Sequence, residues 1–125
     1  MMMKMTSRAT LPSLAAVLAV CAAAHAAPMA STAAACDVSK DGRKLGATYV
    51  TSLSATKVSC PKAKKLVKSF NSCRRAHGGV KGKCSSFSGY ICTETRKAIP
   101  TEFSAKVACK ASGGRRLKFA YSQFT

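Results

Sequence analysis

Six cysteines between residues 36 and 109 constrain the fold of this chain more than any other feature. They follow a short apolar leader, and a seventh cysteine, Cys21, lies inside that leader. An even number of cysteines in a small exported chain predicts a framework of disulfides. We therefore expect covalent pairing among Cys36, Cys60, Cys73, Cys84, Cys92 and Cys109.

Residues 1–26 have the pattern of a signal peptide. Two basic residues and no acidic one precede an alanine- and leucine-rich stretch, and Ala24-His25-Ala26 supplies the small residues that a signal peptidase recognises. The apolar stretch is too short for a membrane span, which needs about 20 residues. We therefore expect cleavage after Ala26 and export of the remaining chain.

A lipoprotein signal, cleaved before Cys21, is the alternative for the same segment. Such signals have a small residue just before the cysteine, and Val20 departs from that pattern. Both interpretations predict a secreted or cell-envelope protein, and both take Cys21 out of the disulfide count.

Cleavage leaves a small and strongly basic chain. Without Lys4 and Arg8, 19 basic residues stand against four acidic ones, a net charge of +15. One domain of this size buries a limited core, so three crosslinks of about 2–4 kcal/mol each can decide whether it folds. We expect an uncharged flexible spacer over residues 27–35 and a monomeric disulfide-stabilised domain over residues 36–125.

The clearest secondary-structure signal is a helix over residues 60–77. Pro61 suits the first turn, Ser59 is the better N-cap, and Gly78-Gly79 ends the helix. One apolar stripe recurs at helical spacing, made by Ala63, Leu66, Val67, Phe70 and Cys73.

Strands are predicted on both sides of this helix. Residues 47–59 and 87–97 have strand composition, and residues 103–110 and 115–124 alternate between apolar and polar side chains. A three-residue loop over residues 112–114 would pair Cys109 with Leu117 and keep both apolar faces together. The sequence therefore predicts an α+β fold, in which one helix packs on a small antiparallel sheet in the order β-α-β-β-β.

One disulfide pairing is favoured by position in the chain. Cys73 lies at the end of the predicted helix and Cys84 in the loop that follows, so we expect a bridge between them. The other four cysteines leave several pairings open. Their spacing lacks the close pairs typical of zinc sites, so we expect no metal and no cofactor.

Basic side chains gather on two predicted faces, one on the helix (Lys64, Lys65, Lys68, Arg75) and one on the last hairpin (Lys106, Lys110, Arg116, Lys118). So few acidic residues cannot neutralise them, and such a field attracts polyanions in a salt-dependent way. We expect a non-enzymatic domain that associates with anionic polymers or surfaces, such as cell-envelope polymer, lipid head groups or extracellular nucleic acid. Most aromatic residues occupy apolar-face positions, so no platform for base stacking is predicted.

Two non-enzymatic alternatives remain open. A secreted inhibitor or protein-recognition module would use loop 78–86 or loop 98–102, the latter stiffened by Pro100. An antimicrobial protein would use the amphipathic helix on a membrane, although the fold needs the apolar stripe of that helix.

A small secreted ribonuclease is the enzymatic alternative. It would use His77 and Glu94 for proton transfer and Arg96 or Arg115 as a phosphate clamp. Nothing in the spacing of these residues places them together, so we expect no enzyme.

Four short runs resemble small secreted bacterial proteins that have no assigned activity: Val58-Ser59-Cys60-Pro61-Lys62-Ala63, Cys73-Arg74, Gly89-Tyr90-Ile91-Cys92 and Val107-Ala108-Cys109. The resemblance covers residues 47 to 121. It implies export and the order of helix and strands, and it carries over no functional residue.

Overall fold

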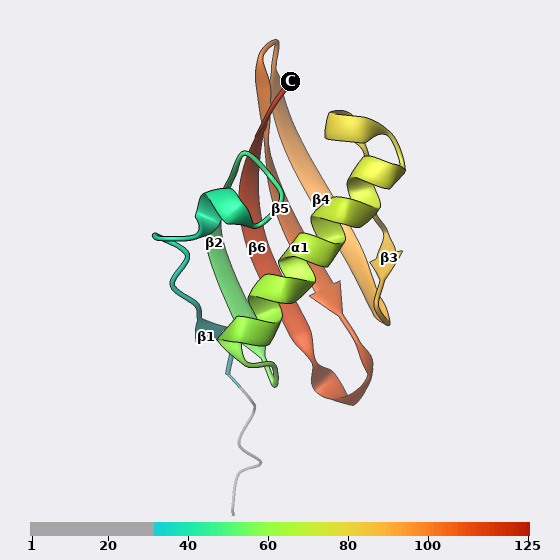
Figure 1. The fold of residues 1–125 in the computed structure, drawn as a ribbon. Coiled ribbons are helices and arrows are strands. Elements are labelled where there is room, and N and C mark those ends of the chain that lie inside the picture. Colours follow the sequence, from blue (N-terminus) through green and yellow to red (C-terminus); the bar gives the residue numbers. More distant parts are fainter. Residues whose placement is uncertain (1–31) are drawn as a thin grey trace, which may run out of the picture.

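A single long helix, α1 (Cys60–Ala76), lies across one face of a six-stranded antiparallel sheet in the computed structural model, which describes residues 32–125 (Figure 1). The sheet order is β1-β2-β6-β5-β4-β3. Its strands are β1 (Ala34–Ala35), β2 (Tyr49–Thr56), β3 (Ser86–Phe87), β4 (Tyr90–Ile99), β5 (Glu102–Lys110) and β6 (Arg116–Phe124). The predicted α+β fold and its order are confirmed, with two short strands added at the edges of the sheet. The expected signal peptide, the alternative cleavage at Cys21 and spacer residues 27–31 lie outside the described residues.

Helix α1 begins and ends where the local chemistry requires. Ser59 is the N-cap, and its hydroxyl oxygen accepts a hydrogen bond from the backbone N–H of Lys62 at 3.4 Å. The helix ends at Ala76, two residues before Gly78 takes a left-handed φ of +139°. The predicted stripe faces the sheet, with Phe70 fully buried.

The last hairpin has the predicted register. Cys109 lies opposite Leu117 and Val107 opposite Phe119, and the backbone N–H of Ala111 donates to the carbonyl of Arg115 at 2.9 Å across the loop. All four paired side chains are therefore buried on the face that α1 covers. At the centre of this core the ring of Phe70 packs edge-on against Phe119, with centroids 5.0 Å apart.

The strand predicted over residues 47–59 is shorter, because β2 covers only Tyr49–Thr56. It pairs with β6, so the first long strand lies beside the last. A bulge at Thr51 shifts the register, which explains the irregular alternation of this stretch.

Two other boundaries need correction. Ala34–Ala35, inside the expected spacer, form β1, because Cys36 beside them donates its backbone N–H to the carbonyl of Leu53 at 2.8 Å and is bridged to Cys60. The strand predicted over residues 87–97 is divided into β3 and β4 by a turn at Ser88 and Gly89, both with positive φ. Strand β4 then continues to Ile99.

Three disulfides join these elements. The expected bridge between Cys73 and Cys84 is present, with Cα atoms 5.6 Å apart. The four cysteines whose pairing was open form Cys36–Cys60 and Cys92–Cys109. The second of these links β4 to β5 at directly opposed positions. Three bridges in one small domain are typical of proteins that fold in an oxidising compartment.

Candidate functional site

Four exposed cations of the β5–β6 hairpin share the face of the sheet that points away from α1. Strands β5 and β6 alternate without a break, so the side chains that flank the buried ones emerge on the opposite side. We call this surface the basic sheet face, defined by Lys106, Lys110, Arg116 and Lys118.

The pairing register makes these four cations neighbours. Lys110 lies directly opposite Arg116, while Lys118 lies opposite Ala108, diagonal to both Lys106 and Lys110. Like charges placed directly opposite one another destabilise a sheet. The basic sheet face therefore carries a repulsion that folding alone does not favour.

The four acidic residues leave this repulsion uncompensated. Asp41 pairs with Lys64 at 2.9 Å, and Glu94 pairs with Arg96 at 3.0 Å, which are the two ion pairs within residues 32–125. Asp37 accepts the backbone N–H of Ser39 at 2.9 Å, and this contact with Ser39 lowers the pKa of its carboxyl group. Glu102 lies at the far end of β5, opposite Phe124.

Three neighbouring hollows open on the same face. Their volumes are about 500, 340 and 260 Å³, and Lys118 lines all three. Around the largest hollow, Lys106 and Lys118 stand among hydroxyl side chains from β2 and β4 (Ser52, Ser54, Thr93, Thr95). The basic sheet face is therefore recessed rather than flat.

The predicted helix cations lie on the other side of the molecule. Lys65, Lys68 and Arg75 are exposed on α1, and Lys64 is partly neutralised by Asp41. Because α1 covers one face of the sheet and the hairpin cations occupy the other, the eight predicted residues form two separate surfaces rather than one (Figure 1).

The side chain of Arg74 is fully buried, which was not predicted from the sequence. Its guanidinium donates to Asn71 Oδ1 at 2.6 Å, to Gln123 Oε1 at 2.5 Å and to the carbonyl of Val80 at 2.8 Å. It also lies over the ring of Tyr121, 4.8 Å from the centroid. Burial lowers the pKa of Arg74, but the hydrogen-bonded oxygens favour the charged form. The signal was present in the sequence, since Arg74 follows Phe70 by four residues on the apolar stripe.

Arg96, on β4, also donates hydrogen bonds to backbone carbonyls of the segment that follows α1. Its guanidinium donates to the carbonyls of Lys81 at 2.7 Å and Gly82 at 2.5 Å, beside its ion pair with Glu94. The carboxylate of Glu94 also accepts a hydrogen bond from the hydroxyl group of Tyr121. Burial, followed by this bond and the charge of Glu94, raises the pKa of Tyr121.

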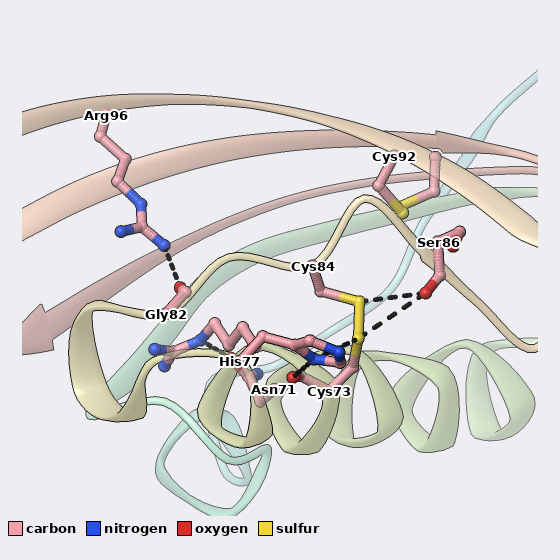
Figure 2. Close-up of a disulfide and its surroundings, with 10 residues drawn as sticks. Asn71, Cys73, His77, Gly82, Cys84, Ser86, Cys92 and Arg96 are labelled. Carbon is pink, nitrogen blue, oxygen red and sulfur yellow. Dashed lines mark hydrogen bonds between the residues drawn. A yellow bond between two sulfur atoms is a disulfide. The ribbon is translucent and has the colours of Figure 1, made fainter.

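Both arginines hold one segment, which we call the clamped loop, residues 77–85. The Cys73–Cys84 disulfide closes it at the base, and Arg96 binds the carbonyl of Gly82 (Figure 2). Arg74 binds the carbonyl of Val80 in the same loop. Gly82 lies so close to α1 that a Cβ would come within 1.7 Å of the Arg74 carbonyl oxygen. The clamped loop is therefore fixed against α1 and β4, and the turn at residues 100–101 follows β4 at the same end of the molecule (Figure 1).

The residues proposed for a ribonuclease are only partly assembled. Glu94 and Arg96 are in contact. His77 Nδ1 lies 2.7 Å from the carbonyl oxygen of Cys73, and Arg115 donates to the carbonyl of Ser112 at 3.0 Å. His77 therefore contacts the end of α1, Arg96 the clamped loop and Arg115 the loop at residues 112–114, and only Glu94 and Arg96 lie together.

Within residues 32–125, no group of three or more His, Cys, Asp or Glu side chains is placed to hold a metal ion. No helix in this range is both long and apolar enough to cross a membrane. Comparisons of the chain with protein-family models, with curated proteins and with solved structures give no match.

Proposed function

We propose that this protein is a secreted or envelope-associated, non-enzymatic domain that binds anionic polymers through its basic sheet face. The observation that carries the proposal is the direct opposition of Lys110 and Arg116, beside Lys118, without a carboxylate partner among residues 32–125. A surface that keeps like charges together at a cost in stability is suited to a ligand that brings the opposite charge.

The internal bonds of the other cations strengthen this assignment. Arg74 and Arg96 donate to oxygens inside the fold, and Lys64 is paired with Asp41. Among residues 32–125, the unpaired cations that the register places directly opposite one another, Lys110 and Arg116, are on the sheet rather than on the helix. The proposed route to this location is cleavage of residues 1–26, with lipid attachment at Cys21 as the alternative, and the three disulfides suit either route.

The decisive experiment compares two double variants of residues 27–125 that lose the same charge on opposite faces. The variant Lys106→Gln/Lys118→Gln alters the basic sheet face, and Lys65→Gln/Lys68→Gln alters α1. On heparin and DNA columns we expect the wild type to elute at high salt and the sheet variant to elute at much lower salt than the helix variant. Each lysine that contacts the polyanion releases counterions from it, so only the loss of contacting lysines weakens the salt-dependent binding.

Two results would oppose the proposal. Elution of the wild type alongside a neutral protein would exclude association with polyanions. Equal shifts for the two variants would show that net charge acts without the basic sheet face. An intact-mass measurement of the exported protein identifies the cleavage site, any lipid and the number of oxidised thiols.

A second candidate, a protein-recognition module, is favoured by the clamped loop. Its exposed Val80 lies on backbone that Arg74 and Arg96 hold, and the exposed Ile99 lies beside the turn at residues 100–101. Rigid loops bind with a smaller loss of conformational entropy. Binding to an acidic secreted protease that Val80→Asp abolishes and Lys106→Gln/Lys118→Gln leaves intact would favour this function over the first.

A further inference from the structure

The largest hollow on the basic sheet face runs across the strands rather than along them. The register aligns Thr93, Ala108, Lys118 and Ser54 in one row, and Thr95, Lys106, Ala120 and Ser52 in the next. Both rows line the hollow, which reaches Ala35 of β1 at its far end. With strands about 4.8 Å apart, the distance from β1 to β4 is roughly 19 Å.

The two rows offer the same set of chemical groups. Each has one ammonium group, from Lys118 or Lys106, and two hydroxyl groups, from β4 and β2. An ammonium group only donates hydrogen bonds, whereas a hydroxyl group both donates and accepts them. A ligand that alternates anionic groups with hydroxyl groups along a line matches this arrangement.

Single-stranded nucleic acid fits the hollow less well, because its bases bind proteins largely by stacking on aromatic rings. The one aromatic residue in the lining is Phe119, which is buried and packs its ring against Phe70 on the helix side. The outer side of the hollow therefore offers lysines, hydroxyl groups and small alanine side chains, with no ring on which a base can stack.

A lipid surface fits less well for a different reason. Amphipathic proteins bind bilayers through a continuous apolar surface beside their cations. The exposed Ile91 and Ile99 lie at opposite ends of β4, and Glu102 separates Ile99 from Phe124 across the sheet. The apolar side chains of this face are therefore divided.

We infer that this hollow is a groove for one chain of a linear anionic polysaccharide that bears carboxylate or sulfate groups. The inference rests on the proposed function and specifies its ligand. The charged groups of the polymer would lie on Lys106 and Lys118, and its hydroxyl groups would bond the serine and threonine side chains of the two rows. The cations attract the polymer, and the groove selects it.

Filling the groove without changing charge tests this inference. Ala108 is exposed between Thr93 and Lys118, so Ala108→Leu obstructs the groove, whereas Ala76→Leu makes the same change at an exposed position of α1. By calorimetry with size-defined heparin oligosaccharides, we expect Ala108→Leu to raise Kd at least about tenfold and Ala76→Leu to leave it unchanged.

A second variant removes hydroxyl groups instead of space. Thr93→Val/Thr95→Val keeps the shape and strand preference of both side chains, and loss of their two hydrogen bonds to the polymer should raise Kd roughly tenfold or more. Single-stranded DNA of equal charge, which contacts only the lysines, should bind all these variants as it binds the wild type. Melting temperatures establish that each variant is folded.

The outcomes separate the inference from the proposed function. Oligosaccharide binding that resists Ala108→Leu and Thr93→Val/Thr95→Val but weakens in Lys106→Gln/Lys118→Gln would overturn the groove and keep the function. If Ala108→Leu and Thr93→Val/Thr95→Val weaken binding to single-stranded DNA or anionic vesicles as much as binding to the oligosaccharide, the choice of polysaccharide is overturned. Absence of binding to all three probes would overturn the proposed function itself.

Discussion

Cations inside this molecule differ from those on the basic sheet face in residue type, partners and consequence. Arg74 and Arg96 point inward, and their guanidinium groups donate to several carbonyl, amide and carboxylate oxygens. Lys106 and Lys118 point outward from the other side of the same sheet and pair with no carboxylate of residues 32–125. A planar guanidinium suits several fixed acceptors, while a lysine remains hydrated and extends its field into solvent. Total charge therefore overstates what is available to a ligand, because position decides whether a cation builds the fold or attracts a partner.

Removing one of the inward-pointing arginines should have the largest effect on stability. Arg74→Ala removes the donor to Asn71, Gln123 and the carbonyl of Val80 and leaves space in the core. We expect a loss of about 3–5 kcal/mol in the free energy of unfolding. The next residue is a matched control, because Arg75 is exposed and Arg75→Ala should cost less than about 0.5 kcal/mol. Urea unfolding of the oxidised proteins measures both, and similar values for the two would contradict the internal role of Arg74.

The interior network should also make stability depend on pH. Burial and Glu94 raise the pKa of Tyr121, so the folded protein retains a proton that the unfolded chain releases above about pH 10. The stabilisation is therefore complete below pH 10 and is lost as the pH rises above it. Tyr121→Phe should cost about 1–3 kcal/mol at pH 8, because Glu94 loses a donor, and should flatten the decline above pH 10. Unfolding in urea between pH 8 and pH 11 tests this, with Tyr49→Phe as control. An unchanged alkaline decline in Tyr121→Phe would show that other groups cause it.

Features that depend on residues close together in the chain could be predicted from the sequence, whereas features that depend on pairing between distant segments could not. Alternation along β5 and β6 and the helical stripe of α1 are local patterns, and the parity of the last loop was enough to pair Cys109 with Leu117. Strands β1 and β3 have two residues each, too few to show any period. The Cys92–Cys109 bridge depends on the β4–β5 register, which the two-residue turn at Pro100 and Thr101 sets by pairing Ile99 with Glu102.

The candidate site was predictable in its parts but not in its arrangement. Periodicity assigned Lys65 to one face of α1 and Lys118 to one face of β6, and both are exposed as expected. It could not show that no carboxylate of residues 32–125 forms an ion pair with Lys110 and Arg116, which the register places directly opposite one another. The hollow was also invisible in the sequence, because its rows join residues from four strands that meet only through pairing.

The smallest predicted effect distinguishes a binding surface from a merely solvated one. Lys110→Thr relieves the repulsion with Arg116, so it should raise the free energy of unfolding by about 0.2–1 kcal/mol. The same change should lower the salt concentration at which the protein elutes from heparin, because the basic sheet face loses a charge. Lys97→Thr is the control, since Lys97 lies opposite Ser104 and its removal relieves no such pair. Arg74→Ala would thus lose stability for an internal reason, while Lys110→Thr would gain stability and lose affinity. A fall in both quantities for Lys110→Thr would show that the paired cations support the sheet, and that their opposition is no sign of a ligand.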